Sequence, residues 1–442
     1  MNNMSEIRET NKMNEIPDEH KIEIISTLYN KCKEARLGGD NKRAYSYFLL
    51  CMKVLDIDYL NCSLDKFPIE ISSLVYQLFD EFCIFSFYVN KKKEGLIISD
   101  KLLFNYTASQ LLNTGLLARN QKYYMNKLNV KDKKQIVVTC EENYVGMNPS
   151  IIKRNNGYLL NFRTSNFGLK SGGIYYCRSP DGVIDTINYI LELDGNLNVL
   201  TKRRVHDVSK TKVYPRNNIR GLEDLIIFEI DTELWGTCTL LDAQPNHVPL
   251  IGLCKLKLEN DEYFIKNKRP LLTETEGRCE KNWLPVYHDG KIKLVYGYSP
   301  TQVRTPCESI EHIKLEEGYL NTKILVSFVS KLKFDRFRGS GGPILFNNGW
   351  LIIVHEVSWN HDNSRVYTHR FVYLNKEFEI TKLSDPWYFE SHGIEFCRSM
   401  CESINGEDII ITCGLKDEEA WCYIMEKEKI TLMLKDLQEF EL

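Results

Sequence analysis

The segment Arg338-Gly-Ser-Gly-Gly-Pro-Ile-Leu-Phe-Asn-Asn-Gly-Trp-Leu-Ile-Ile-Val-His355 holds two apolar runs on either side of Asn347-Asn-Gly349. Asn and Gly tolerate the positive φ of a tight hairpin turn, so the pattern predicts a β-hairpin. The C-terminal two-thirds of the chain repeats it. The other copies lie in Asn148–Arg163, Glu223–Thr237, Lys281–Tyr296 and Arg398–Gly414.

The predicted turns recur at intervals of about 57 to 75 residues, near Gly157, Asp231, Gly290, Gly349 and Gly406. A recurring hairpin unit of this length is typical of repeat architectures, and five units predict a five-bladed β-propeller over residues 135–442. Loops from every blade meet at one concave site in such a fold. We therefore expect the functional residues where the repeats carry charge.

The N-terminal part has a different pattern. Residues 1–20 are polar, which predicts disorder, and residues 21–130 carry apolar residues at spacings of three and four, which predicts helices. The helix pairs resemble tetratricopeptide repeats, and a plain helical packing domain is an equal alternative to a peptide-binding one. The expected fold class is multidomain α + β, with an all-α helical repeat domain before an all-β propeller.

Composition and net charge exclude some classes of function. The chain has 442 residues and a formal net charge of −3, so it carries no electrostatic footprint for nucleic acid or for an anionic membrane. Fourteen cysteines follow a polar N-terminus and show no paired Cys-x-x-Cys spacing, so we expect reduced thiols and a cytoplasmic protein. We expect no metal, no cofactor and no membrane span.

Four motifs resemble glycoside hydrolase family 130. They are Gly221-Leu-Glu-Asp224, Lys281-Asn-Trp-Leu-Pro285, Gly339-Ser-Gly-Gly-Pro-Ile344 and Ile411-Thr-Cys-Gly-Leu-Lys-Asp417. The resemblance covers about residues 148–423 and implies a five-bladed propeller with mannoside phosphorylase or β-mannosidase activity. The whole chain is also similar to the C-terminal part of large proteins in which a family 2 glycosyltransferase domain precedes tetratricopeptide-like helices and this propeller.

The resemblance implies Asp224 as the general acid of an inverting glycosyl transfer, with Glu223 beside it to separate the two pKa values. Glu356 and Glu395 are candidates for the second carboxylate that activates water. The implied substrate- or phosphate-binding residues are Asn148, Arg163, Arg220, Lys281, Asn282, Arg338, Ser340, His355, Glu356, Glu395 and Asp417. The ligand is an oligosaccharide or glycoside, with phosphate or a sugar phosphate as a further expectation.

Each of these residues also has a structural interpretation. Glu223 and Asp224 would cap a loop, and each Arg would form an ion pair with Glu223, Asp224, Glu280 or Asp335. The aromatic residues would lie in the core rather than stack on sugars. The aromatic residues in question are Trp283, Trp350 and Tyr298.

Two departures from the family pattern bear on the reaction. Leu225-Ile226 stand where the family has Pro-Arg after the acid, and Tyr298-Ser299-Pro300 stand where it has His-Arg-Pro. Each lost charge-assisted contact removes roughly 1.5 to 3 kcal/mol from an anion site, which argues against ordinary phosphorolysis. Hydrolysis, transfer from another donor and binding without turnover remain. The alternative is a non-catalytic glycan-binding or scaffold module that partners a glycosyltransferase through the helices.

Overall fold

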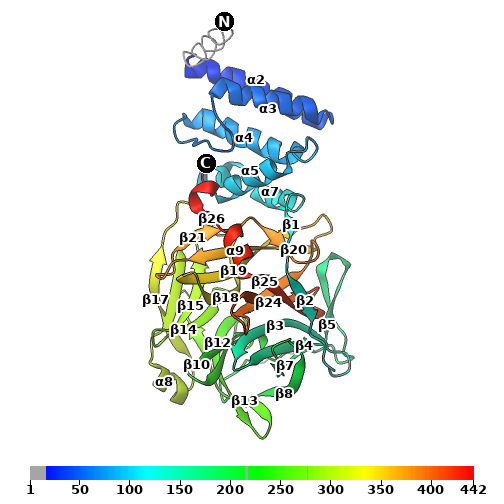
Figure 1. Ribbon diagram of the computed structural model, residues 1–442, viewed down its shortest axis with the longest axis vertical. Helices are drawn as coiled ribbons and strands as arrows, with labels where there is room; N and C mark the ends of the chain where they lie inside the picture. Colours follow the sequence, from blue (N-terminus) through cyan, green and yellow to red (C-terminus); the bar gives the residue numbers. More distant parts are fainter. Residues whose placement is uncertain (1–15, 215–217, 276) are drawn as a thin grey trace. The chain divides into compact units, whose positions relative to one another are not determined.

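The computed structural model describes residues 16–214, 218–275 and 277–442 and divides into two compact units. One comprises residues up to Asn126 with Lys331–Lys333 and Asp436–Leu442, and the other comprises Lys127–Ser330 and Phe334–Lys435. Segment 1–20 is predicted to be disordered, and its residues 1–15 lie outside the described residues. N-terminal helices followed by β-sheets confirm the coarse fold class (Figure 1).

The first unit is helical. The first helix among its described residues begins at Asp18, three residues before the predicted start. Asp40 caps the next helix by accepting a hydrogen bond from the Arg43 backbone N–H at 3.1 Å. Phe48 stacks on Phe82 with 4.5 Å between ring centroids, and both rings are buried in the helical core. The helices are α2 (Asp18–Leu37), α3 (Asn41–Leu55), α4 (Ile69–Phe85), α5 (Lys92–Phe104), α6 (Tyr106–Leu111), α7 (Thr114–Gln121) and the C-terminal 3-10 turn η2 (Leu437–Phe440).

The second unit consists of consecutive antiparallel groups of four strands, as the hairpin copies predict (Figure 1). The first group is β3 (Val145–Arg154), β4 (Gly157–Ser165), β7 (Ile184–Leu193) and β8 (Val199–Asp207). The second is β10 (Glu223–Ile230), β11 (Glu233–Leu240), β12 (Leu250–Glu259) and β13 (Glu262–Leu272). The third is β14 (Leu284–His288), β15 (Lys291–Tyr298), β16 (Thr301–Pro306) and β17 (Leu320–Phe328).

The fourth group is β18 (Arg338–Phe346), β19 (Gly349–Trp359), β20 (Arg365–Leu374) and β21 (Ile380–Leu383). The fifth is β23 (Glu395–Glu402), β24 (Asp408–Leu415), β25 (Glu419–Glu426) and β2 (Asp132–Gln135). The remaining elements are β1 (Asn126–Lys127), β5 (Phe167–Lys170), η1 (Ser171–Gly173), β6 (Ile174–Cys177), β9 (Ile219–Arg220), α8 (Ile310–Leu315), β22 (Trp387–Tyr388), α9 (Lys427–Met433) and β26 (Lys435–Asp436).

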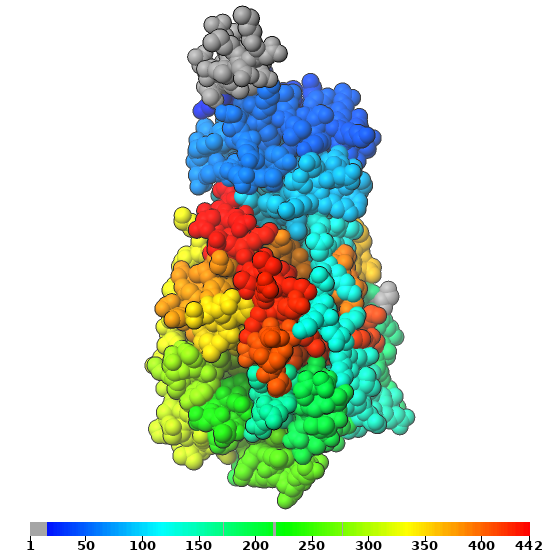
Figure 2. All heavy atoms as spheres, viewed as in Figure 1, coloured from blue at the N-terminus to red at the C-terminus, as the bar shows by residue number. Residues whose placement is uncertain are grey.

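The first strands of the groups form a ring. β3 lies next to β10, β10 next to β14, β14 next to β18, β18 next to β23, and β23 next to β3 again. Strand β2, which precedes the first group in the sequence, completes the last group by pairing with β25. Figure 2 shows this join on the surface, where the cyan segment that contains β2 lies against the red and orange residues of the last strands. The architecture is propeller-like.

Bulges interrupt most of the first strands near their starts. The register shifts between Met147 and Ser150 in β3, between Glu223 and Ile226 in β10, and between Cys397 and Ser399 in β23. A bulge turns a side chain away from the regular alternation and is common beside functional sites. In the described part of the chain, no helix is long and apolar enough to cross a membrane.

Candidate active site

A cavity of about 600 Å³ gathers most of the residues that the motifs single out. The singled-out residues that line it are Asn148, Arg163, Arg220, Glu223, Asp224, Lys281, Asn282, Arg338, His355 and Asp417. Four of them have left-handed backbone, namely Asn148, Asp224, Asn282 and Asp417, with φ between 45° and 63°. Asn and Asp enter this region more readily than other side chains, and strained backbone of this kind clusters at functional sites.

Asp224 lies in the β10 bulge and is buried. Its Oδ1 accepts a hydrogen bond from Arg163 Nη1 at 2.6 Å and another from Asn148 Nδ2 at 3.3 Å. Burial raises the pKa of Asp224, but Arg163, Arg398 and Lys281 outweigh burial and hold that pKa below its ordinary value. Asp224 is therefore ionised at neutral pH in the unliganded protein.

Asp417 lies in the turn between β24 and β25 and is also buried. Burial raises its pKa to about 6, the negative charges of Asp224 and Glu223 act in the same direction, and Arg163 opposes them. Asp224 and Asp417 share Arg163 and Asn148 as neighbours. Two carboxyl groups of one cavity thus have pKa values moved in opposite directions, so Asp417 takes up a proton at a higher pH than Asp224 does.

Cations surround the two carboxyl groups. Arg163 is 4% exposed and also lies 3.6 Å from Glu223 Oε1, while Lys281 Nζ lies 2.9 Å from Glu223 Oε2. Arg398, 1% exposed, donates from Nη2 to the backbone carbonyl of Asp224 at 2.7 Å. Its Nε and Nη1 have no hydrogen-bond partner among the described residues. This buried guanidinium fixes the Asp224 backbone and adds positive charge beneath the cavity.

Arg220 and Arg338 are exposed cations on the cavity wall, and neither has an ion pair with any residue in the described ranges. Arg163 forms the ion pairs with Asp224 and Glu223 that the structural interpretation predicts for each Arg, and Lys281 pairs with Glu223 as well. The four cations occupy different positions in their groups. Arg163 lies on β4, Arg220 on β9, Lys281 before β14 and Arg338 at the start of β18.

His355 lines the cavity, and its Nδ1 lies 2.8 Å from the Ser340 hydroxyl. Burial, together with His369, Arg338 and Arg398, lowers the pKa of His355 well below its ordinary value. The imidazole is therefore neutral, and it supplies a hydrogen-bonding group rather than a charge. Ser340 does not line the cavity and acts on it only through His355.

Glu356 and Glu395 do not line the cavity, so the structure corrects their assignment as candidate bases. Glu356 points into an ion-pair network, with Arg370 Nε at 2.9 Å and Arg336 Nε at 3.2 Å. Glu395 accepts hydrogen bonds from three successive backbone N–H groups, those of Phe389, Glu390 and Ser391, at 2.6 to 2.8 Å. Both carboxylates are committed to holding the backbone and neighbouring side chains in place.

The aromatic residues proposed to stack on sugars lie in the core. Trp283 is 1% exposed, and Trp350 and Tyr298 are also buried away from the cavity. The rings that line it are Phe167, Tyr175, Trp359, Tyr367 and Phe396. They lie on β5, β6 and strands of the last two groups. These strands come together at the cavity because the five groups form a ring, and the local sequence around each aromatic residue does not reveal this.

The sequence motifs also omit Arg365 and Arg398. Arg365 donates to the Tyr175 hydroxyl at 3.1 Å, and its guanidinium lies 5.5 Å from the Trp359 ring centroid. Arg398 had a signal in the sequence, because it is the single cation within the apolar strand 395–402. Within the described ranges, no three His, Cys, Asp or Glu side chains come together in a way that would hold a metal ion.

Several solved structures are similar to this chain. One is described as belonging to the GH130 family of mannoside phosphorylases, which contains glycoside hydrolases that target β-1,2 mannosidic linkages in Candida mannan. It has 11% identity and a TM-score of 0.49, and the match covers 69% of this chain and 97% of that protein's chain. β-1,2-Mannobiose phosphorylase from Listeria innocua has 13% identity and a TM-score of 0.43, over 67% and 94%. A mannose phosphorylase from Leishmania mexicana in complex with phosphate has 12% identity and a TM-score of 0.44, over 70% and 93%. No protein-family model and no curated protein sequence matches this chain.

Proposed function

We propose that this chain is a carbohydrate-active protein that transfers the glycosyl group of mannose-type β-glycosides with inversion, and that its sheets form a five-bladed propeller. The ring of first strands and the closing strand β2 support five blades. One observation carries the activity. Ten of the candidate residues that the sequence predicts, distant along the chain, line one cavity large enough for a small glycoside.

In this proposal the Asp224–Asp417 pair supplies the proton for the leaving group. Protonated Asp417 gives its proton toward the glycosidic oxygen as the bond from that oxygen to the anomeric carbon breaks, and an acceptor forms a new bond from the opposite face. The motif alone assigns the acid to Asp224. Because Arg163 and Arg398 hold Asp224 ionised while burial raises the pKa of Asp417 to about 6, Asp417 is the group of the pair that can carry the proton, and Asp224 is its charged partner.

The cationic wall suits an anionic acceptor or donor. Arg220 and Arg338 are exposed to the cavity, and a guanidinium binds phosphate through paired hydrogen bonds. Water, phosphate and a sugar hydroxyl all fit as acceptors by chemistry. A panel of β-mannosides with water or phosphate, and of sugar-phosphate and nucleotide-sugar donors, therefore tests the proposal.

Asp417→Asn and Asp224→Asn should each lower product formation by at least a hundredfold, the usual range for loss of a positioned acid or base. Asp231→Asn is the matched control, because Asp231 has the same left-handed backbone and lies in the β10–β11 turn outside the cavity. It should retain full activity. Turnover that survives in both cavity variants would refute the catalytic assignment.

A specific observation supports a second candidate, a glycan-binding module without turnover that partners a glycosyltransferase through its helices. Leu225 and Ile226, which stand where the family has Pro-Arg, are 0% and 3% exposed and pack in the core. They offer no cation to the cavity. Glycan binding by the wild type and by both Asn variants, with no product from any donor, would favour this candidate.

A further inference from the structure

Part of the large cavity is lined by aromatic side chains and one cation. These residues, which we call the aromatic wall, are Tyr175 on β6, Val357 and Trp359 on β19, and Arg365 and Tyr367 on β20. The aromatic wall contains no carboxylate, in contrast to the part of the cavity that holds Asp224 and Asp417. None of its residues lies in the motifs that the chain shares with the family it resembles.

Strand register brings the β19 and β20 members of the aromatic wall together. Trp359 pairs with Arg365, and Val357 pairs with Tyr367. Directly paired residues of antiparallel strands project to the same face, and so do alternate residues of one strand. These four side chains therefore form one surface. His355, two residues before Val357 on β19, continues this surface and also lines the cavity.

The hairpin of β5 and β6 supplies Tyr175. Its ring centroid lies 5.4 Å from that of Phe167, which also lines the cavity. Arg365 donates a hydrogen bond to the Tyr175 hydroxyl at 3.1 Å. The Arg365 guanidinium lies 5.9 Å from the Tyr175 ring centroid and 5.5 Å from that of Trp359. Arg365 thus connects the hairpin to the surface formed by β19 and β20.

Two rings of the aromatic wall are accessible to a ligand. Trp359 is 46% exposed and Tyr175 is 44% exposed. Exposed aromatic rings inside a cavity offer apolar surface that a bound molecule can cover. Arg365 has no ion pair among the residues that the structure describes, so its guanidinium is not committed to a carboxylate.

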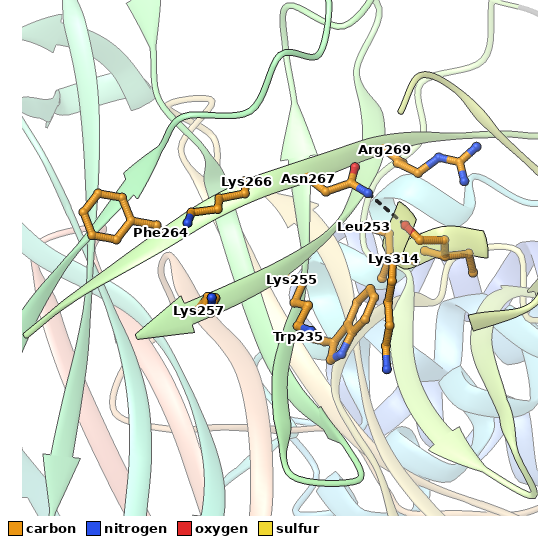
Figure 3. A pocket seen from close by; sticks show the side chains of 10 residues that line it. Trp235, Leu253, Lys255, Lys257, Phe264, Lys266, Asn267, Arg269 and Lys314 are labelled. Atoms are coloured by element: carbon orange, nitrogen blue, oxygen red, sulfur yellow. Dashed lines mark hydrogen bonds between the residues drawn. The ribbon is translucent and has the colours of Figure 1, made fainter. Parts of the chain in front are cut away.

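The described residues that line a second cavity, of about 110 Å³ beside helix α8, offer no such combination (Figure 3). Trp235 in that cavity is only 2% exposed. Lys255 and Lys314 both pair with Glu233, so their charges are already balanced within the protein. Exposed rings beside an uncommitted cation therefore distinguish the aromatic wall from this smaller cavity.

The aromatic wall adjoins the carboxyl group that can carry the proton. Partial burial raises the pKa of Tyr175 to about 12, and the negative charge of Asp417 raises it as well. The pKa of Tyr367 is raised by the same two causes. A general acid must lie beside the oxygen that departs with the leaving group. The leaving group of a bound glycoside therefore extends from Asp417 toward the aromatic wall.

A second sugar residue fits the chemistry of the aromatic wall. One face of a pyranose ring consists of C–H groups, and covering an aromatic ring with that face removes the apolar surface of both from water. The hydroxyl groups at the edge of the sugar need hydrogen-bond partners, which Arg365 and the two tyrosine hydroxyls supply. A methyl group or a phosphate in this place would leave the rings uncovered.

We propose that the aromatic wall binds the sugar residue on the leaving-group side of the scissile bond, so that the preferred substrates are β-mannosides whose aglycone is itself a sugar. Trp359 and Tyr175 cover the apolar face of that residue, and Arg365 binds its hydroxyl groups. The inference rests on the proposed function for the reaction, but binding of the disaccharide does not require turnover.

Isothermal titration calorimetry with two ligands tests the proposal. A β-linked mannobiose and methyl β-mannoside share one mannose residue, and only the mannobiose has a second ring. The full chain carries Asp417→Asn throughout, so that no ligand is consumed. The mannobiose should bind about tenfold or more tightly than methyl β-mannoside. Product formation by the wild type is measured in parallel, which separates a failure of turnover from a failure of the aromatic wall.

Trp359→Ala and Tyr175→Ala should each weaken the binding of mannobiose roughly tenfold and leave the binding of methyl β-mannoside unchanged. Tyr176→Ala is the matched control. Tyr176 follows Tyr175 on β6, projects to the opposite face of the hairpin and does not line the cavity, so both affinities should stay the same.

Equal affinities of the two ligands, or binding of neither, would overturn the proposal. Equal losses of both ligands in Trp359→Ala would overturn it too, because the ring would then contact the shared mannose residue. A nucleoside monophosphate that loses affinity in Trp359→Ala, while mannobiose does not, would assign the ring to a base instead. The expected affinities without product formation by the wild type would support the sugar site and refute turnover.

Discussion

Replacing Asp417 with Asn should stabilise the sheet unit at pH 8. The native state raises the pKa of Asp417 from 3.8 to about 6, so ionising this carboxyl costs more in the folded chain than in the unfolded one. A shift of about two units, at 1.36 kcal/mol per unit, is worth about 3 kcal/mol. The neutral Asn side chain avoids that cost and keeps nearly the same volume.

The pKa of Asp417 is raised on folding, whereas the pKa of a carboxyl in an ion pair is usually lowered, so its effect on stability has the opposite sign. A raised pKa means that the folded state binds more protons than the unfolded state between pH 3.8 and 6, so the penalty is absent below that window and complete above it. The gain from Asp417→Asn should therefore be about 3 kcal/mol at pH 8 and fall to about 0.5 kcal/mol at pH 4.

Urea denaturation followed by tryptophan fluorescence measures this effect, because all six tryptophans lie in the sheet unit. Asp224→Asn is the matched comparison. The pKa of Asp224 is lowered in the folded state, so its ionised form is stabilising above its unfolded pKa, and removing it leaves Arg163 without its closest partner. At pH 8 this variant should lose stability while Asp417→Asn gains it. Two variants that shift stability in the same direction at pH 8 would refute the assignment of the proton.

Two further outcomes follow from the ion pairs and from the exposed cations. Glu356→Gln should cost about 3 to 5 kcal/mol of the free energy of unfolding at pH 8, because it leaves Arg336 and Arg370 in a buried network without their carboxylate; unchanged urea denaturation would contradict this. Arg338→Gln should weaken binding of sugar phosphates at least tenfold and leave binding of neutral mannosides unchanged, as measured by calorimetry; equal losses for both ligands would show that Arg338 binds the sugar and not the phosphate.

The hairpins could be predicted from the sequence because each depends on a few adjacent residues. Asn155-Asn156 before Gly157 and Asn347-Asn348 before Gly349 lie exactly where the strands reverse. The resemblance also singled out ten of the residues that line the cavity. The turn residues are a local signal, and the motif residues are a signal because their chemistry is shared by the family that the chain resembles.

The features of the site that the sequence does not predict depend on contacts between segments that are distant along the chain. Burial of Ser340, Glu356 and Glu395 follows from strands that pack against them, and the sequence around each resembles that of a cavity residue. The lowered pKa of Asp224 arises from Arg163 on β4, Arg398 on β23 and Lys281, all far from it along the chain, whereas the raised pKa of Asp417 arises from its burial and from the charge of Asp224. The aromatic lining depends on how β5, β6 and β20 approach the cavity.

The pairing of β2 with β25 has a consequence for how the chain is made. Asp132 pairs with Ile424, so a ribosome completes β2 long before its partner emerges. The four strands of each of the first four groups follow one another along the chain, whereas the fifth group includes β2 and must wait for nearly the whole chain. Contacts of such long sequence separation form slowly. The ring, and the cavity to which the β24–β25 turn contributes Asp417, should therefore close only after synthesis has passed Glu426, with the unpaired edge of β2 exposed until then.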